Sequence, residues 1–246
     1  MNSQKKLAII TVHNGTSGEL ERTLKSIDNQ INKPHLSLIV AKQIKNFNKK
    51  KYLKKYRNFI IGKDKSLWNA MNISLNYTQK FFILFLNSGD IFYNNNSVTN
   101  ILNSIKKNSV NYIFKTQLVY DDIIFTPKSN FFCNKSYSPH PAFVRCPLKS
   151  KNINKYNEKN LINADGEWMQ IERQRSSVKK INKVITKHYL DGQSTNPKLG
   201  SVYKLFYDHP FSGVKEFIKL ILNLIFEKKT YYKLIYFLKY KIKNDY

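Results

Sequence analysis

Runs of apolar residues alternate, in the first part of the chain, with segments whose apolar positions recur every three or four residues. The runs predict strands at 7–12, 36–41, 59–62 and 81–87. The periodic segments predict helices at 16–31 and 66–80. Strands without polar alternation are typical of a parallel sheet that helices cover. Because such strands and helices alternate with short joints, the pattern predicts an α/β fold with a mostly parallel central sheet flanked by helices.

The first predicted helix carries signals for its start and for its buried face. Thr16 and Glu19 fit a capping box at the start. The apolar side chains that share one helical face are Leu20, Leu24, Ile27 and Ile31. The basic stretch 42–58 predicts a loop or an exposed helix.

The alternation becomes less regular after Asp90. A helix is predicted at 97–108, strands at 111–115, 122–127 and 184–190, and a loop entering a strand at 138–145. In the last stretch, 213–246, apolar and aromatic residues alternate with lysines at helical spacing, which predicts one or two basic amphipathic helices. Such helices either lie in a membrane interface or pack on the rest of the chain, and the sequence leaves both readings open.

Charge narrows the class of partner without identifying it. The 246 residues include 42 Lys and Arg against 16 Asp and Glu, a formal net charge of +26. Such a charge favours nucleic acid, an anionic membrane surface or a phosphorylated substrate. The lysines are dispersed, however, and Lys, Asn, Ile, Tyr and Phe are all used heavily, as genomes of biased base composition favour. Part of the positive charge is therefore explained by base composition and does not itself indicate a function.

Targeting and redox signals are few. The apolar run Leu7–Val12 is too short for a signal-peptide core. No segment approaches the ~20 apolar residues of a membrane span. Cys133 and Cys146 are too few for a disulfide framework and lack the spacing of a metal site. We therefore expect a soluble or peripheral cytoplasmic protein.

A carboxylate stands where the most apolar strand ends. Six apolar residues, Phe81–Leu86, run into Asn87, Ser88, Gly89 and Asp90. In open α/β sheets, ligands bind at the carboxyl ends of the strands. Asp90 is therefore a candidate for a functional site, and the alternative is a turn carboxylate that ends a strand.

Further fragments follow the same order as in a known family. They are "TVHN" (Thr11–Asn14), "DKSLWNAMN" (Asp64–Asn72), "FLNSGD" (Phe85–Asp90), "HPAFVR" (His140–Arg145), "NADGEW" (Asn163–Trp168) and "YLDGQS" (Tyr189–Ser194). Together they resemble the family 2 glycosyltransferases, inverting enzymes of the GT-A fold that build bacterial surface polysaccharides. The resemblance implies a Rossmann-like GT-A catalytic domain at 1–200, with a nucleotide-binding half at about 1–95 and an acceptor half at about 96–200. The basic amphipathic tail then occupies 201–246.

The resemblance implies metal-dependent transfer from a nucleoside diphosphate sugar. Asp90 matches the last acid of the family's metal-binding motif and would hold Mn²⁺ or Mg²⁺, which stabilises the charge on the departing diphosphate. Ser88 stands where many relatives have the first acid of the motif, so the diphosphate and waters would supply further oxygen ligands. The residues implied for the donor site are Thr11, Val12, His13, Asn14, Asp64, Asn69, Asn72, Ser88, Gly89 and Arg145.

The resemblance also implies catalytic residues. Inversion requires a base that takes the proton of the acceptor hydroxyl. Asp165 is the first candidate and Glu167 the second, because residues two apart on a helix point about 200° from each other. His140 is implied to contact the diphosphate or the acceptor, with a structural histidine as the alternative. For Asp64, the alternative to a donor-site role is a place in a helix-capping turn. For Arg145, the alternative is an ordinary exposed residue at a strand end.

Some positions depart from the family pattern. Ala41 and Lys42 stand where relatives commonly have an Asp that contacts the nucleotide. Asn69 replaces an Asp of the family, and Ser66 replaces a Gly. These departures leave a more positive donor pocket, a different donor or a catalytically degenerate protein as alternatives.

The expected function is therefore transfer of a sugar, with a UDP-sugar as the expected donor, to a hydroxyl of a glycan. A polyprenyl-linked oligosaccharide of an O-antigen, capsule or lipooligosaccharide is a common acceptor in the family. The tail at 213–246 would then lie on the anionic inner face of the cytoplasmic membrane. A nucleotidyltransferase is disfavoured because no Gly-rich basic loop follows the first strand. A nucleic-acid-binding protein lacks a recognised binding motif here.

Overall fold

The computed structural model describes residues 5–44, 47–128, 140–148, 153–160, 164–190, 210–237 and 240–244. The chain forms two compact units whose segments are interleaved in the sequence. The first unit comprises residues 1–116, 132–159 and 164–188. The second comprises residues 117–131, 160–163 and 189–246. Each unit has a hydrophobic core.

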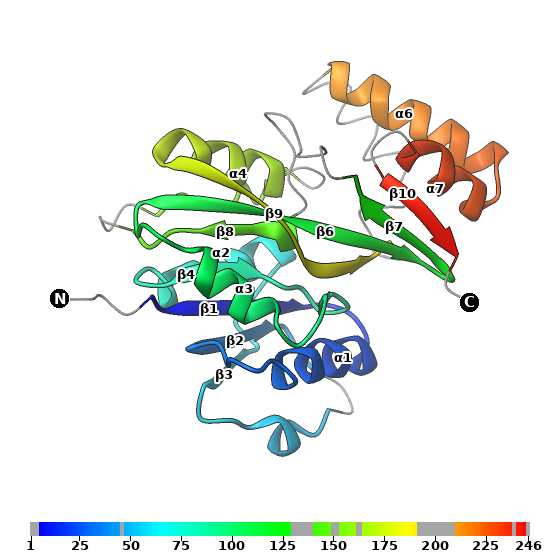
Figure 1. Cartoon of the computed structure of the whole chain (residues 1–246). Helices are drawn as coiled ribbons and strands as arrows, with labels where there is room; N and C mark the ends of the chain where they lie inside the picture. The colour runs from blue at the N-terminus through cyan, green and yellow to red at the C-terminus, as the bar shows by residue number, and fades with distance from the viewer. Residues whose placement is uncertain are drawn as a thin grey trace. The chain divides into compact units, whose positions relative to one another are not determined.

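The first unit is built on a mostly parallel sheet. Its parallel strands are β1 (Leu7–His13), β2 (Leu36–Ala41), β3 (Arg57–Ile61) and β4 (Phe82–Phe85). β1 lies between β4 and β2, and β3 forms the edge (Figure 1). Register pairs Val12 with Val40 and Ile10 with Phe85. The α/β fold predicted from the apolar runs is confirmed.

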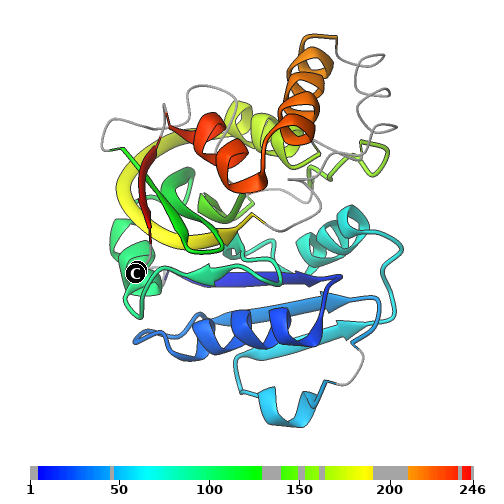
Figure 2. The same cartoon turned by 90° about the vertical axis from the view of Figure 1, so that its right-hand side faces the viewer.

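Antiparallel strands extend this sheet on the other side of β4. β8 (Phe143–Arg145) pairs with β4 and with β6 (Val110–Tyr120). The short β5 (Ile91–Phe92) pairs with β9 (Ser177–Tyr189), which curves strongly (Figure 2).

Helices cover both faces of the sheet (Figures 1 and 2). One core cluster contains residues of α1 (Ser17–Asp28) and α3 (Ser97–Ser104). The other contains residues of α2 (Leu67–Tyr77) and α4 (Ala164–Arg175). The single-turn helices η1 (Lys49–Tyr52) and η2 (His140–Ala142) complete the unit. The alternation of side chains along β1 explains the two clusters, because Leu7 and Ile9 face one layer while Ala8 and Ile10 face the other.

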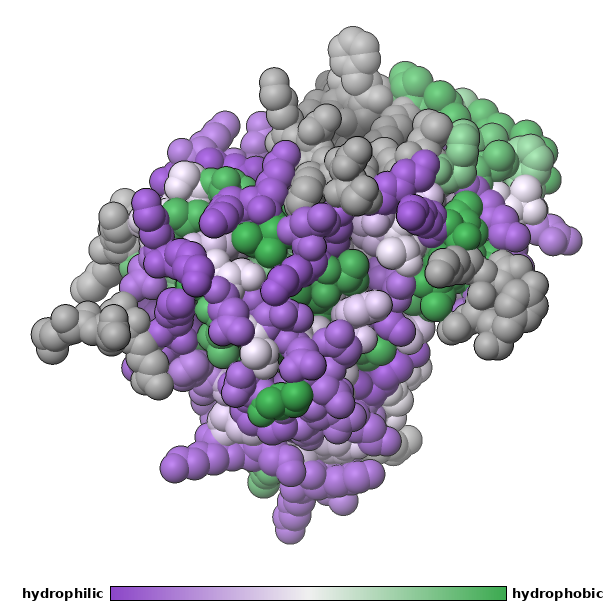
Figure 3. Space-filling view, viewed as in Figure 1, coloured by the Kyte–Doolittle hydropathy of each residue, from purple (hydrophilic) through white to green (hydrophobic). Residues whose placement is uncertain are grey.

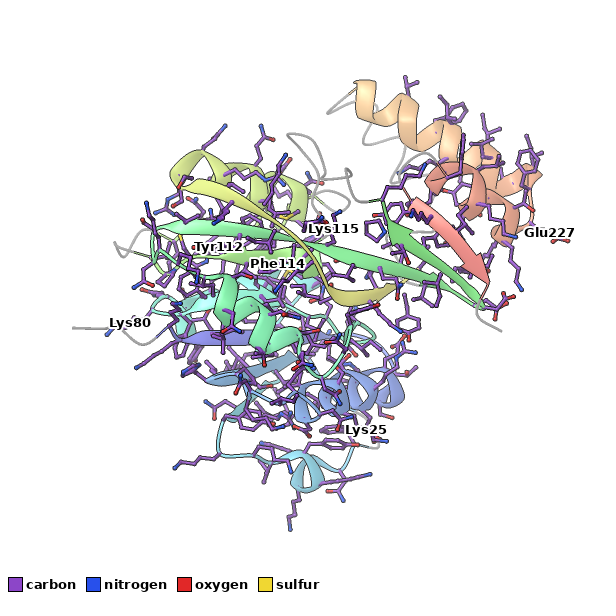
Figure 4. The ribbon with its side chains drawn as sticks, in the orientation of Figure 1. Lys25, Lys80, Tyr112, Phe114, Lys115 and Glu227 are labelled. Atoms are coloured by element: carbon purple, nitrogen blue, oxygen red, sulfur yellow. The ribbon has the colours of Figure 1, made fainter. Side chains whose placement is uncertain are left out.

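β6 shows the same alternation of apolar side chains over Tyr112–Phe114 and then continues with buried polar residues. Tyr112 and Phe114, both labelled in Figure 4, belong to the core cluster that contains α1 residues. Ile113 belongs to the cluster that contains α4 residues. Lys115 follows Ile113 on that face and is only 6% exposed. Burial lowers the pKa of Lys115.

Some element boundaries differ from the predicted ones. α1 ends at Asp28, and Ile31 is 66% exposed instead of lying on the buried face. Beyond the helix, the buried side chain of Gln30 donates to the carbonyl of Asn94 at 2.8 Å and accepts the N–H of Val98 at 3.0 Å, which holds the chain after α1 against 94–98. β6 and β9 are both longer than the predicted strands at 111–115 and 184–190.

The second unit contains β7 (Ile123–Pro127), α6 (Pro210–Ile225), α7 (Lys228–Tyr236) and β10 (Tyr240–Asn244). The prediction of helix throughout the tail is wrong at its end, because β10 pairs antiparallel with β7. The ring of Tyr236 packs 5.3 Å from that of Phe125 and 5.4 Å from that of Tyr240. Among the described residues, no helix combines the length and apolarity that crossing a membrane requires.

Candidate functional site

The turn that follows β4 is built to hold a carboxylate. Gly89 has a φ of +102°, a conformation that residues with a Cβ rarely adopt. The hydroxyl of Thr23, on α1, accepts the N–H of Gly89 at 3.0 Å and donates to the carbonyl of Asp90 at 2.7 Å. These two hydrogen bonds position Asp90, which is 5% exposed, at the carboxyl end of the parallel strands.

Asp90 contacts a histidine that lies far away in the sequence. Nδ1 of His188, on β9, is 2.7 Å from Oδ1 of Asp90. Burial by itself lowers the pKa of His188. The charge of Asp90, the hydrogen bond to it and the charge of Asp165 together outweigh burial, so the pKa is raised. The sheet therefore holds a carboxylate and an imidazole as a charge-assisted pair.

The predicted base lies close enough to this pair for their charges to interact. Asp165 is in the first turn of α4, where its Oδ1 accepts the N–H of Gly166 at 2.8 Å. Burial raises the pKa of Asp165, while its backbone hydrogen bonds and the charge of His188 oppose the rise. Glu167 instead contacts the loop before α4, where its Oε2 is 3.5 Å from Nδ2 of Asn157.

A hollow of about 420 Å³ lies at the carboxyl ends of β1 and β2. Its lining residues are His13, Asn14, Gly15, Thr16, Ser17, Lys42 and Gln43. The first turn of α1 borders it, and the N–H groups and dipole of a helix start favour anions. Nδ1 of His13 is 2.9 Å from Oγ of Ser88. His13 therefore connects the hollow to the turn that carries Asp90.

Buried polar atoms near these strand ends lack partners among the described residues. They include Oγ1 of Thr11, on β1, Oδ1 of Asp64, after β3, and Oδ1 of Asn87, after β4. Burial raises the pKa of Asp64, and the charge of Lys42 opposes that rise. Because buried polar atoms in proteins are nearly always hydrogen-bonded, such atoms near a hollow are places where a bound ligand can supply the partner. Val12 acts through its backbone, where its carbonyl accepts the N–H of Ser88 at 3.0 Å.

Asn69 and Asn72 both hold the loop at 153–160. Nδ2 of Asn69 donates to Oε1 of Glu158 at 3.1 Å, and Nδ2 of Asn72 donates to the same oxygen at 2.9 Å. Asn72 also accepts the N–H of Tyr156 at 2.7 Å. The two amides lower the pKa of Glu158. Both side chains are therefore engaged within the protein.

His140 lies inside an aromatic cluster. Its ring stacks on Phe85 at 4.8 Å, and its Nε2 is 2.8 Å from the hydroxyl of Tyr156. Tyr156 in turn stacks on Trp168 at 4.7 Å. Burial, helped by the charge of His188, lowers the pKa of His140 to about 3. The structure gives this histidine a neutral ring and a packing role, while its predicted catalytic contact stays a prediction.

Arg145 is the predicted site residue that the structure does not bring to this edge. It pairs with Ile83, near the start of β4, whereas Asp90 follows the end of that strand. Its residue exposure is 1%, so it is not the exposed strand end that the alternative supposes. Nε and Nη2 have no hydrogen-bond partner among the described residues, and burial lowers the pKa of the guanidinium.

The donor set fits a divalent cation that is shared with a substrate. Asp90 offers a carboxylate oxygen, an ordinary ligand of divalent cations, while Nδ1 of His188 lies 2.7 Å from that carboxylate and orients it. No group of three or more His, Cys, Asp or Glu side chains suited to a metal occurs in the described part of the chain. Oxygens of a diphosphate and of water would have to complete the coordination.

Sequence reasoning did not single out His188 or Thr23 as site residues. His188 sits near the end of a predicted strand, directly before the "YLDGQS" fragment, which is the one sequence signal that pointed to its position. Thr23 lies within a helix and carries no motif. Asn163, Asp191–Ser194 and Cys133 lie outside the described residues.

Comparison with known proteins shows a shared fold. No protein-family profile and no curated protein matches the sequence. A crystal structure of Staphylococcus aureus TarS, residues 1–349, superposes with a TM-score of 0.62 at 13% identity, covering 89% of this chain and 78% of that one. The complex of the same TarS fragment with UDP-GlcNAc gives 0.59 at 15% identity, covering 92% and 69%.

A second protein is similar to a comparable extent. The mannosyltransferase PcManGT from Pyrobaculum calidifontis, in complex with GDP-Man and Mn²⁺, gives a TM-score of 0.56 at 10% identity, covering 89% of this chain and 65% of that one. This chain therefore shares with these proteins a mixed α/β fold in which helices flank a mostly parallel central sheet.

Proposed function

We propose that this protein is an inverting glycosyltransferase that moves a sugar from a nucleoside diphosphate donor, a UDP-sugar in the first instance, to a hydroxyl of a glycan. The observation that carries the proposal is the grouping of Asp90, His188 and Asp165 at the carboxyl edge of the parallel sheet. His13 connects this group to the hollow at the ends of β1 and β2. A substrate with a nucleoside at one end and a reactive phosphate–sugar bond at the other suits such a layout.

The donor nucleoside diphosphate would occupy the hollow and extend toward the Ser88–Asp90 turn. The unpartnered oxygens of Thr11 and Asp64 offer hydrogen bonds to the base or ribose. Nη2 of Arg22 lies 3.7 Å from the point where a Cβ on Gly89 would stand, so a guanidinium flanks the turn. Because Gly89 has no side chain, a phosphate can approach the backbone there.

The reaction requires one bond to form as another breaks. The acceptor oxygen bonds to the anomeric carbon, and the bond between that carbon and the donor phosphate oxygen breaks on the opposite side of the sugar. The acceptor proton passes to the carboxylate of Asp165. Burial raises the pKa of this carboxyl group, which brings its basicity nearer to that of an effective base at neutral pH.

A divalent cation bound beside Asp90 would supply positive charge to the departing diphosphate. His188 would keep the Asp90 carboxylate oriented toward that position, at the 2.7 Å separation of their atoms. Thr23 would fix the turn beneath it through the backbone of Gly89 and Asp90.

The structural neighbours support the choice of donors for testing. TarS has been crystallised with UDP and with UDP-GlcNAc, and PcManGT with GDP-Man and Mn²⁺. We further propose that the protein acts in surface polysaccharide synthesis, with a lipid-linked oligosaccharide as acceptor. This part of the proposal rests on the order of the motif fragments in the sequence.

Calorimetric titration of the full chain with UDP, GDP and their sugars, each with and without Mn²⁺, tests the proposal. We expect one base to bind, more tightly with metal, and Asp90→Asn to weaken the metal-dependent part at least tenfold. The matched control is Asp122→Asn, a surface carboxylate 2.7 Å from Lys229. For a turnover-competent pair, proton NMR of the product would show the inverted anomer. Retention of configuration, or equal binding by both Asn variants, would contradict the proposal.

A further inference from the structure

One face of α6 consists of exposed apolar side chains. The members of this α6 stripe, with their exposed fractions, are Val214 (48%), Phe217 (41%), Ile218 (51%), Ile221 (39%), Leu224 (78%) and Ile225 (67%). Their spacing of three and four residues places them on one side of the helix. In Figure 3, apolar side chains form the visible surface at the position of this helix. Isolated exposed apolar residues are ordinary, but a contiguous stripe of six indicates an interaction surface.

Within the second unit, α6 packs on the core through a position outside the stripe. Leu222, between stripe positions, packs against the core of the second unit, which includes Tyr231 and Tyr232 of α7. The hydroxyl of Tyr232 donates to the carbonyl of Leu190 at 3.1 Å, which ties α7 to the chain before the tail. The second unit therefore has a core of its own. Among the described residues of the second unit, none of the stripe positions belongs to this core.

The stripe is long and wide enough to act as a surface. From Val214 to Ile225 the helix rises about 17 Å, at about 1.5 Å per residue. The neighbouring pairs at 217–218 and 224–225 widen it beyond a narrow coiled-coil seam. α7 and its junction with α6 add Phe226 (39%), Leu234 (42%) and Phe237 (52%) as further exposed apolar residues.

The charge around the stripe limits what can cover it. Residues 210–244 contain eight lysines and two acidic residues. Lys228, Lys233 and Lys241 are exposed. A symmetric contact between two copies would bring two such positive surfaces together, which repel each other. An anionic bilayer offers an apolar interior for the stripe and negative head groups for the lysines.

We propose that the α6 stripe inserts into the surface of an anionic lipid bilayer, with the neighbouring lysines at the head groups. The helix then lies in the plane of the interface, and its apolar face reaches about 5–10 Å into the acyl boundary. This inference rests on the second unit alone and does not require the proposed transferase activity.

Flotation of the full chain with vesicles tests the proposal. The probes are vesicles of phosphatidylcholine alone and of phosphatidylcholine with 30% phosphatidylserine. The test variant is Ile218→Ser with Leu224→Ser, two exposed positions whose replacement leaves the core intact. The matched control is Ile31→Ser with Leu53→Ser, which removes two exposed apolar side chains, 66% and 53% exposed, from the first unit.

We expect wild type and control to float with the anionic vesicles at least tenfold more than with neutral ones. The stripe variant should lose at least nine-tenths of this binding and keep the same circular dichroism spectrum. Equal flotation of stripe variant and control, or no binding to anionic vesicles, overturns the proposal. Light scattering that shows a wild-type dimer broken by the stripe variant would assign the face to a second copy instead, which also overturns it.

Discussion

Replacing Thr23 by Val tests whether the hydroxyl of Thr23 holds the turn that carries Asp90. The change removes the hydroxyl that accepts the N–H of Gly89 at 3.0 Å and donates to the carbonyl of Asp90 at 2.7 Å. Gly89 and Asp90 are both buried, so water does not readily replace these bonds. Each buried backbone group left without a partner costs about 1–3 kcal/mol. Two such groups are left here, so we expect Thr23→Val to lower the free energy of unfolding by about 2–6 kcal/mol.

The same change should reduce turnover through the position of Asp90. A displacement of about 1 Å in a site of this kind lowers the rate by ~10²-fold. Thr23→Ser keeps the hydroxyl and serves as the control, with most of the activity retained. Urea unfolding and donor turnover are measured on all three proteins. If Thr23→Val loses less than about 0.5 kcal/mol, a typical neutral surface change, and turns over like wild type, the reasoning about this turn is refuted.

Three further changes test other parts of the site. Asp165→Asn should lower kcat by ~10²–10⁴-fold with little change in donor affinity, and an unchanged kcat in steady-state assays would remove Asp165 as the base. His140→Phe should flatten the pH dependence of stability. The folded pKa of about 3 lies below the ordinary 6.5, so the unfolded chain binds the extra proton and stability falls as pH drops from 7 toward 3. This loss of unfolding free energy is up to roughly 5 kcal/mol in wild type. Urea unfolding at pH 4 and pH 7 that shows the same change in unfolding free energy for wild type and for His140→Phe would contradict it. Asn69→Asp should place a carboxylate about 3 Å from that of Glu158 and lower the free energy of unfolding by about 1 kcal/mol. Adding Glu158→Gln should remove this cost in a double-mutant cycle, and a cost that remains would show that the two side chains are not directly coupled.

Much of the first unit follows from local patterns. β4 is a continuous apolar run, and β1 and β2 are mostly apolar. The capping box at Thr16 forms as predicted, with Glu19 accepting the N–H of Thr16 at 2.8 Å. The position of Asp90 at a strand end was also readable, because a strand must end where Ser88 and Gly89 interrupt an apolar run. These are short-range properties, which a sequence displays directly.

The partners of Asp90 depend on long-range packing and were not readable. His188 is 98 residues away in the sequence, and only the pairing of β9 with β5 brings it to the turn. The predicted roles of Asn69 and Asn72 came from a motif, yet their amides bond Glu158 in a loop that no periodic pattern marks. The bond to Glu158 also accounts for Asn69 in place of the family's Asp, since two carboxylates would repel each other there.

The exposed face of α6 illustrates a different limit. Helical spacing of apolar residues predicted an amphipathic helix, which the structure confirms. Spacing alone does not say whether the apolar face turns inward or outward, because that depends on whether a complementary surface is available. The core cluster that contains Tyr231, Tyr232 and residues of β7 includes no stripe residue, and the stripe positions are 39–78% exposed.

The central claim is tested most directly by the release of nucleoside diphosphate from a panel of nucleotide sugars, with and without Mn²⁺, for wild type and Asp90→Ala. We expect slow hydrolysis of one donor that depends on the cation and is lost in Asp90→Ala. A wild type that turns over no donor, or an Asp90→Ala protein that turns one over at the wild-type rate, would contradict it.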